Sequence, residues 1–294
     1  MTSQDNSEPA QVATDISGLL PPEHWAEELG DTDSALEDDN AESTASITSS
    51  ILEYRNINGR TYHHDIGNAQ YCHHVLTLVL DGVHGWLFWP SKSSTLRQTW
   101  SSDIEDCTQE WTFAPNSQDY IHFRWLVGSI VDWDQLFKEA YRCLKPGGYI
   151  ESHEALSRMD CDDGSITEKS AMHQWGKFFV EGGQKIGRSF TIVEDGVQRS
   201  AMEKAGFVNL EERDFKVPIG GWPRDPKMKE IGKYAQATLE QDIEGYVLFM
   251  ANTVEGWTRA EVEVYVSMLR RELRQGTMHP YYQQKVVWAQ KPNE

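Results

Sequence analysis

Two histidines stand where an α/β protein could use them as acid–base groups. His122 and Arg124 lie at the end of one predicted strand, and His153 and Glu154 lie at the end of a second one. Open α/β sheets bind ligands at the carboxyl ends of their strands, and a histidine placed there can remove a proton from a substrate. The structural alternative is that His153 and Glu154 merely complete a strand end. We predict His122 and His153 as the catalytic residues.

The elements that would position these residues form a strand–helix–strand unit. Residues 118–125 suit a buried strand, Asp132 can cap a helix, and Lys145-Pro146-Gly147-Gly148 ends that helix before a strand over 149–154. Such units produce parallel sheets, so the fold class is α/β. The pattern farther along the chain predicts strands near 207–217 and 282–289 and helical stretches over 227–252 and 258–275.

Charge and composition exclude several classes of protein. The 294 residues include 27 Lys and Arg against 46 Asp and Glu, a net charge of −19. Such an acidic surface repels phosphate backbones and anionic lipid, so we expect no direct nucleic-acid binding. No apolar stretch approaches the length of a bilayer-spanning helix, and the first residues lack a secretory signal. We therefore expect no membrane association and a cytoplasmic or nuclear location.

The first fifty residues differ in composition from the rest. Residues 1–50 hold 12 acidic side chains and no Lys or Arg. A segment with so few large apolar residues cannot bury enough surface to offset its ordering entropy. We predict a disordered acidic tail over 1–50 and a folded domain over 51–294. The short pieces Ile16–Leu20 and Trp25–Leu29 could alternatively dock as a partner motif.

Several other patterns have a structural interpretation as well as a functional one. Gly182–Gly187 indicates a helix end rather than a phosphate loop, and Asp160–Gly164 a solvated turn rather than a calcium loop. His63-His64 and His73-His74 have no carboxylate or thiol at ligand spacing, so we expect no metal site. The four cysteines include no CxxC pair, which favours reduced thiols. Five aromatic residues could line an acceptor pocket or pack in the core: Trp125, Trp175, Trp222, Tyr246 and Trp257.

A set of motifs spread over both halves of the chain is similar to one family. The chain resembles the fungal methyltransferase-domain proteins related to the velvet-associated regulators of secondary metabolism. The segments that carry this resemblance are 51–55, 58–63, 110–113, 119–122, 128–130, 144–148, 218–223 and 279–282. The resemblance implies a class I, Rossmann-like sheet that binds S-adenosylmethionine and transfers its methyl group to a small-molecule acceptor. On that basis we assign Asp106, Cys107 and Arg124 to cofactor binding.

One part of the family pattern is absent from this sequence. No G-x-G-x-x-G follows a predicted strand, and only 13 residues, Pro90–Ser102, separate a predicted hairpin (73–80 and 85–89) from the segment containing Asp106. One βαβ unit needs about 30 residues, so two crossovers cannot fit there. We therefore predict a truncated sheet with an added helical region, an open or collapsed cofactor crevice, and the hairpin beside the strand at 119–123. Pairing in a dimer and a deletion in a larger gene are the alternative explanations.

These observations leave two main hypotheses about function. The first is an S-adenosylmethionine-dependent methyltransferase of fungal secondary metabolism with impaired cofactor binding. The second is a catalytically inactive member of the family that acts as a regulatory protein and binds a protein partner. A repurposed fold that cyclises or isomerises a metabolite is a third possibility.

Overall fold

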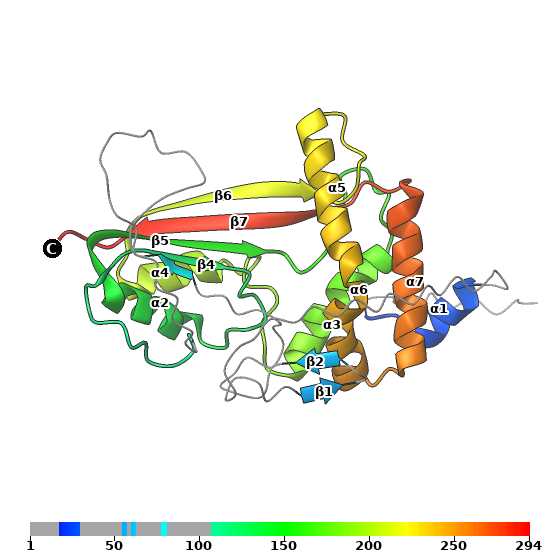
Figure 1. The fold of residues 1–294 in the computed structure, drawn as a ribbon, viewed down its shortest axis with the longest axis horizontal. Coiled ribbons are helices and arrows are strands. Elements are labelled where there is room, and N and C mark those ends of the chain that lie inside the picture. Colours follow the sequence, from blue (N-terminus) through cyan, green and yellow to red (C-terminus); the bar gives the residue numbers. More distant parts are fainter. Residues whose placement is uncertain (1–17, 30–54, 58–59, 63–77, 81–106) are drawn as a thin grey trace, which may run out of the picture.

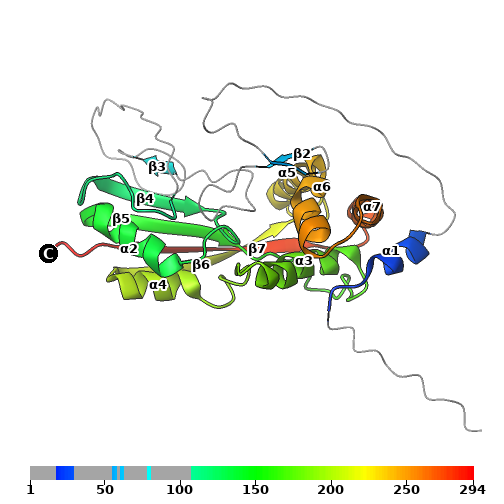
Figure 2. The ribbon, with the colours of Figure 1, turned by 90° about the horizontal axis from the view of Figure 1, so that it is seen from below.

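The protein consists of a sheet region and a helical region that lie side by side along its longest axis (Figure 1). The computed structural model describes residues 18–29, 55–57, 60–62, 78–80 and 107–294. Helices α2 and α4 accompany the sheet, while α1, α3, α5, α6 and α7 gather at the other end (Figures 1 and 2). A separate two-stranded sheet pairs β1 (Arg55–Ile57) with β2 (Arg60–Tyr62).

The main sheet has five strands in the order β3-β4-β5-β7-β6. Their bounds are Leu78–Leu80 for β3, Gln118–Arg124 for β4, Leu144–Ala155 for β5, Val208–Pro218 for β6 and Tyr281–Gln290 for β7. The four strands predicted over 118–125, 149–154, 207–217 and 282–289 are thus confirmed. β5 begins five residues earlier than expected because Leu144 already pairs with Gln118, so the Lys145–Gly148 stretch belongs to the strand.

The expectation of a parallel sheet is wrong beyond one pair of described strands. β4 and β5 run parallel, whereas β7 is antiparallel to both β5 and β6. The reason lies in the register, in which Pro218 at the end of β6 faces Tyr281 at the start of β7. The helices between them leave and return at the same edge of the sheet, so β7 must run back along β6. The fold is therefore an α/β fold with a mixed sheet.

The outer side of β4 is occupied by β3. Leu78 pairs with His122, and Leu80 pairs with Tyr120, in an antiparallel arrangement. This confirms that residues 78–80 of the predicted hairpin lie beside the strand at 119–123. The second arm, 85–89, is outside the residues that the structure describes.

Helices α2 (Trp133–Cys143) and α4 (Val197–Ala205) cover one face of the sheet (Figure 2). The Asp132 side chain accepts a hydrogen bond from the Gln135 backbone N–H, as the predicted cap requires. Because side chains alternate between the faces of a strand, every second residue enters this core. The buried residues shared by strands and helices include Ile121, Phe123, Ile150, Val287, Leu136, Phe137 and Met202.

The second core lies among the helices at the other end of the molecule. It is formed by α3 (Ala171–Lys185), α5 (Pro226–Gln241), α6 (Ile243–Leu248), the π-helical turn η1 (Phe249–Val254) and α7 (Arg259–Gln275). Thr258 and Glu261 make a capping box at the start of α7, which begins where the helix over 258–275 was predicted. The stretch predicted as helical over 227–252 is interrupted at Asp242, whose carboxylate caps α6 by accepting from Gly245. Among the described residues, no helix is long and apolar enough to span a bilayer.

The prediction of disorder is wrong for part of the N-terminal segment. Helix α1 (Pro22–Leu29) packs against α7, and Trp25 is only 1% exposed, with its ring 5.4 Å from that of Tyr265. The preceding residues are held as well, because the Leu19 N–H donates to Glu181 and the Leu20 N–H to Gln174. The prediction relied on the small number of large apolar residues in this segment. A single tryptophan inserted into a core, however, buries enough area to order a short segment.

Candidate active site

Three loops meet at the carboxyl edge of the parallel pair β4 and β5. The segment after β4 is joined to the segment after α3 by a hydrogen bond from Gly128 N–H to the Ser189 carbonyl, 3.2 Å. The segment after β5 is also joined to the segment after α3, because the Ser157 hydroxyl donates a hydrogen bond to the Phe190 carbonyl over 3.0 Å. This convergence is the place where open α/β sheets bind ligands.

The sheet face turned away from α2 and α4 carries the predicted catalytic residues. In cross-strand register, His122 stands opposite Glu151, and Arg124 stands opposite His153. All four are partly or fully exposed, whereas their neighbours Ile121, Phe123 and Ile150 point into the core. The structure therefore brings His122, Arg124 and His153 together on one face.

His122 forms a dyad with Glu151. Its Nδ1 lies 3.0 Å from the Glu151 carboxylate, and the Tyr120 hydroxyl is 3.5 Å from the same nitrogen. The hydrogen bond from His122 holds the pKa of Glu151 below its ordinary value, more than offsetting the effect of burial. Burial, together with the charge of Glu151, raises the pKa of Tyr120, which stays protonated. A Nδ1–H that donates to a carboxylate leaves the lone pair of a neutral ring on Nε2.

His153 is held in the opposite tautomer. Its Nε2 lies 2.7 Å from the Gln284 side-chain oxygen, so Nε2 carries the proton and donates it. Burial is the main cause that lowers the pKa of His153, and the nearby charge of Arg124 acts in the same direction. The ring is therefore neutral near pH 7, with its lone pair on Nδ1.

Glu154 is buried behind these residues and does not reach the exposed face. One carboxylate oxygen accepts hydrogen bonds from the backbone N–H groups of Leu126 and Val127, at 2.8 and 2.9 Å. The other oxygen is buried and has no partner among the described residues. Burial raises the pKa of Glu154 to about 8, although the two backbone donors act in the opposite direction. Glu154 thus fixes the loop that follows β4.

The aromatic candidates divide into two groups. Trp175 and Trp257 are buried in the helical core. Trp125, Trp222 and Tyr246 are exposed. Trp125 directly follows β4, and its ring lies 5.9 Å from that of Tyr282 on β7. Of the five, Trp125 is therefore the one at the sheet edge beside the two histidines.

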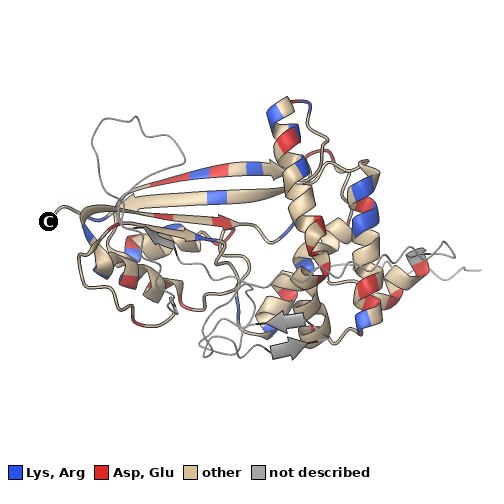
Figure 3. Cartoon of the chain, in the orientation of Figure 1, with Lys and Arg blue, Asp and Glu red and all other residues tan. Residues whose placement is uncertain are grey.

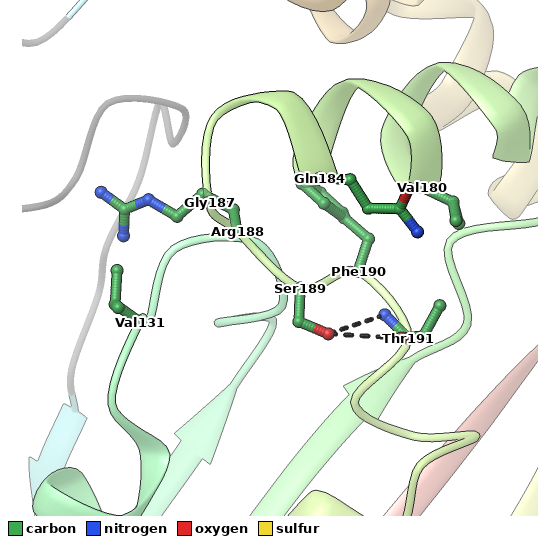
Figure 4. A pocket seen from close by; sticks show the side chains of 8 residues that line it. All are labelled: Val131, Val180, Gln184, Gly187, Arg188, Ser189, Phe190 and Thr191. Carbon is green, nitrogen blue, oxygen red and sulfur yellow. Dashed lines mark hydrogen bonds between the residues drawn. The ribbon is translucent and has the colours of Figure 1, made fainter.

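A cavity of about 310 Å³ opens between the end of α3 and the loop after β4 (Figure 4). Ser189 and Thr191 hydrogen bond to each other on its wall. Of its lining residues, only Gln184 and Gly187 lie in a segment that a sequence pattern marked, the helix end over 182–187. The lining residues are Val131, Val180, Gln184, Gly187, Arg188, Ser189, Phe190 and Thr191. Gly187 follows the end of α3, which confirms the predicted helix end there. A second cavity, about 270 Å³, lies between α5 and the end of α7 beside Trp222.

The described residues do not fit the S-adenosylmethionine cradle that the resemblance implies. Asp106 lies outside the residues that the structure describes. Cys107 is 4% exposed, and its carbonyl accepts a hydrogen bond from the Trp111 ring N–H over 3.1 Å. Neither cavity includes Cys107 or Arg124. Within the described parts of the chain before β4, no strand leads through a glycine turn into a helix.

Metal binding was not expected, and the structure offers no candidate in the parts it describes. No three His, Cys, Asp or Glu side chains there are close enough to hold an ion. The pairs His63-His64 and His73-His74 lie outside those parts. Asp162 and Asp163 of the predicted turn instead pair with Lys216 and His279.

Comparison with known proteins agrees with the predicted family. Residues 65–212, half of the chain, match the family described as a methyltransferase domain. The methyltransferase pytC of Aspergillus terreus is 31% identical over 189 residues, which cover 64% of this chain and 57% of that protein. The secondary metabolism regulator LAE1 of Cochliobolus heterostrophus is 30% identical over 191 residues, covering 64% of this chain and 62% of its own. This chain thus spans less than two thirds of either relative.

Similarity to solved structures is more remote. The phosphoethanolamine N-methyltransferase 2 of Haemonchus contortus is 24% identical and has a TM-score of 0.33, over 64% of this chain and 36% of that one. The [4+2]-cyclase SpnF has a TM-score of 0.34 at 14% identity, over 65% of this chain and 57% of that one. From the family match, the chain belongs to the methyltransferase-domain family, and its relatives are fungal methyltransferases and secondary-metabolism regulators.

Proposed function

We propose that this protein of fungal secondary metabolism binds a small-molecule acceptor at the carboxyl edge of β4 and β5. The observation that carries the proposal is the arrangement of two histidines on one exposed sheet face. Each ring has one nitrogen fixed by a partner, Glu151 for His122 and Gln284 for His153. In each neutral ring the other nitrogen is free to accept a proton from an acceptor hydroxyl or amine.

The two histidines have different surroundings, which suit them to different roles in proton transfer. His153 is neutral near pH 7, because burial lowers its pKa, and it suits the role of base. His122 is oriented by Glu151, whose negative charge stabilises the imidazolium that forms when the ring takes up a proton. In group transfer most of the rate comes from holding the reacting groups in place, so the fixed rings also serve as positioning residues.

We further propose that affinity for S-adenosylmethionine is impaired. The resemblance implies this molecule as the methyl donor, but Cys107 is buried against Trp111 and no described glycine turn offers backbone N–H groups to it. Backbone donors at such a turn provide much of the binding in nucleotide-type sites.

Titration calorimetry with S-adenosylmethionine tests the impairment. We expect a dissociation constant above about 100 μM, which corresponds to a binding free energy weaker than about 5.5 kcal/mol. S-adenosylhomocysteine should behave in the same way. A dissociation constant in the low micromolar range would refute this part of the proposal and indicate a complete methyltransferase site.

A second candidate function, a regulatory protein without catalysis, is supported by a different observation. Three apolar side chains, Tyr149, Val208 and Phe215, are exposed on the same sheet face as the histidines. Exposed apolar patches often mark contacts with other proteins. Co-purification from the native cell would identify such a partner. A protein that is recovered alone and methylates a small molecule would exclude this candidate.

A further inference from the structure

The residue that follows β4 has a backbone conformation that tryptophan rarely adopts. Trp125 has φ = 58°, in the left-handed region. A bulky side chain costs free energy in this region, and such residues persist only where their surroundings hold them. Here three consecutive backbone N–H groups are fixed. Trp125 donates to the His153 carbonyl over 3.1 Å, and Leu126 and Val127 donate to buried Glu154.

The strained conformation does not serve to bury the tryptophan. Trp125 remains 42% exposed, and its ring meets that of Tyr282 edge to face. Burial of a large aromatic side chain would ordinarily compensate for strain, but this ring leaves much of its surface in solvent. Strained residues of this kind cluster at ligand sites, so the exposed ring is a candidate surface for stacking.

The neighbouring residue supplies a positive charge. Arg124 is exposed, and within the described part of the chain its guanidinium has no ion pair or hydrogen bond. Two carboxylates of the neighbouring strand β5 are otherwise engaged, since Glu151 pairs with His122 and Glu154 is buried. Along β6, by contrast, charges of both signs alternate (Figure 3).

Arg124 lies next to the aromatic pair formed by Trp125 and Tyr282. Arg124 pairs with His153 across the two strands, and the next residue, Trp125, places its ring 5.9 Å from that of Tyr282. Burial is the main cause that raises the pKa of Tyr282, and the charge of Arg124 acts against it. Arg124 therefore lies where aromatic rings from β7 and the loop after β4 meet.

We propose that Arg124, Trp125 and Tyr282 form a binding site for a planar aromatic anion, such as an aromatic carboxylate. A guanidinium binds a carboxylate through two parallel N–H donors, and an indole face stacks on an aromatic ring. His153, directly opposite Arg124, then lies within reach of a hydroxyl on that ring. This inference rests on the proposed function, because the bound anion is the class of acceptor assigned to the site.

Calorimetric titration of the full chain with 1-hydroxy-2-naphthoate tests the site. Trp125→Gly removes the ring and relieves the left-handed strain, so a loss of binding in this variant does not arise from unfolding. Trp125→Phe retains an aromatic ring, and Arg124→Gln removes the charge. Two surface variants away from the site serve as controls, Arg199→Gln on α4 and Tyr234→Ala on α5.

We expect Trp125→Gly and Arg124→Gln each to weaken binding of the naphthoate by about tenfold or more, and Trp125→Phe by less than about threefold. The controls should bind like the unmodified chain, and the neutral 1-hydroxy-2-naphthamide should bind about tenfold more weakly than the acid. Failure of the unmodified chain to bind the naphthoate would overturn the site, and so would binding by the Trp125→Gly and Arg124→Gln variants that is as tight as binding by the unmodified chain. If the naphthamide binds as tightly as the naphthoate, the proposed preference of the site for anions is wrong. The titration with S-adenosylmethionine is independent of these outcomes.

Discussion

Replacement of Glu154 by glutamine should change how the stability of this protein depends on pH. The carboxyl group is fully buried, and its pKa is raised from 4.5 to about 8. Glutamine keeps a side-chain oxygen that can accept from the Leu126 and Val127 backbone N–H groups, but it has no proton to lose. The variant therefore isolates the titration of one buried group.

The magnitude follows from the difference between the folded and the ordinary pKa. Because the folded pKa is raised, the folded state binds more protons than the unfolded state between pH 4.5 and 8. The contribution of the group to stability is thus fully present below pH 4.5 and is lost as the pH rises through 8. At about 1.4 kcal/mol for each pH unit, the loss between pH 5 and pH 9 is about 4 kcal/mol.

Urea unfolding of both proteins at pH 5, 7 and 9 measures this loss. The free energy of unfolding of the unmodified protein, relative to that of Glu154→Gln, should fall by about 4 kcal/mol over this range. Other titrating groups are common to both proteins and cancel in the comparison. Parallel pH profiles, agreeing to within about 1 kcal/mol, would refute the assignment of Glu154 as a buried group that is protonated at neutral pH.

Three further predictions, tested by urea unfolding, concern the packing and capping of the helical region and the loop after β4. Trp25→Ala should lower the free energy of unfolding by about 3–5 kcal/mol, because it leaves a cavity beside Tyr265; an effect below about 1 kcal/mol would mean that α1 is not docked. Gly128→Ala should cost about 2–4 kcal/mol, since its Cβ would lie 2.2 Å from the Phe190 ring, while Gly187→Ala, with a similar φ but open space, should cost only about 1 kcal/mol. Thr258→Ala should cost about 1 kcal/mol by removing the cap of α7, and an unchanged stability would contradict the capping box.

The sequence was sufficient to locate most of the regular elements. Asp132 begins α2, Thr258 and Glu261 begin α7, and Gly206 ends α4 in a left-handed conformation. These signals can be read from the sequence because each depends on hydrogen bonds or backbone conformations within a few residues. The sequence also allowed us to predict that His122 and His153 lie near each other, because parallel strands joined by one helix bring their carboxyl ends together.

Other features depended on contacts between residues far apart in the chain. The direction of β7 follows from the pairing of Pro218 with Tyr281, which no local pattern specifies. The docking of α1 requires the cavity beside Tyr265 that receives Trp25. The left-handed backbone of Trp125 is held by the His153 carbonyl and by buried Glu154, which is 28 residues from Leu126. Burial, strain and partner choice are properties of the assembled core, and only the tertiary structure determines them.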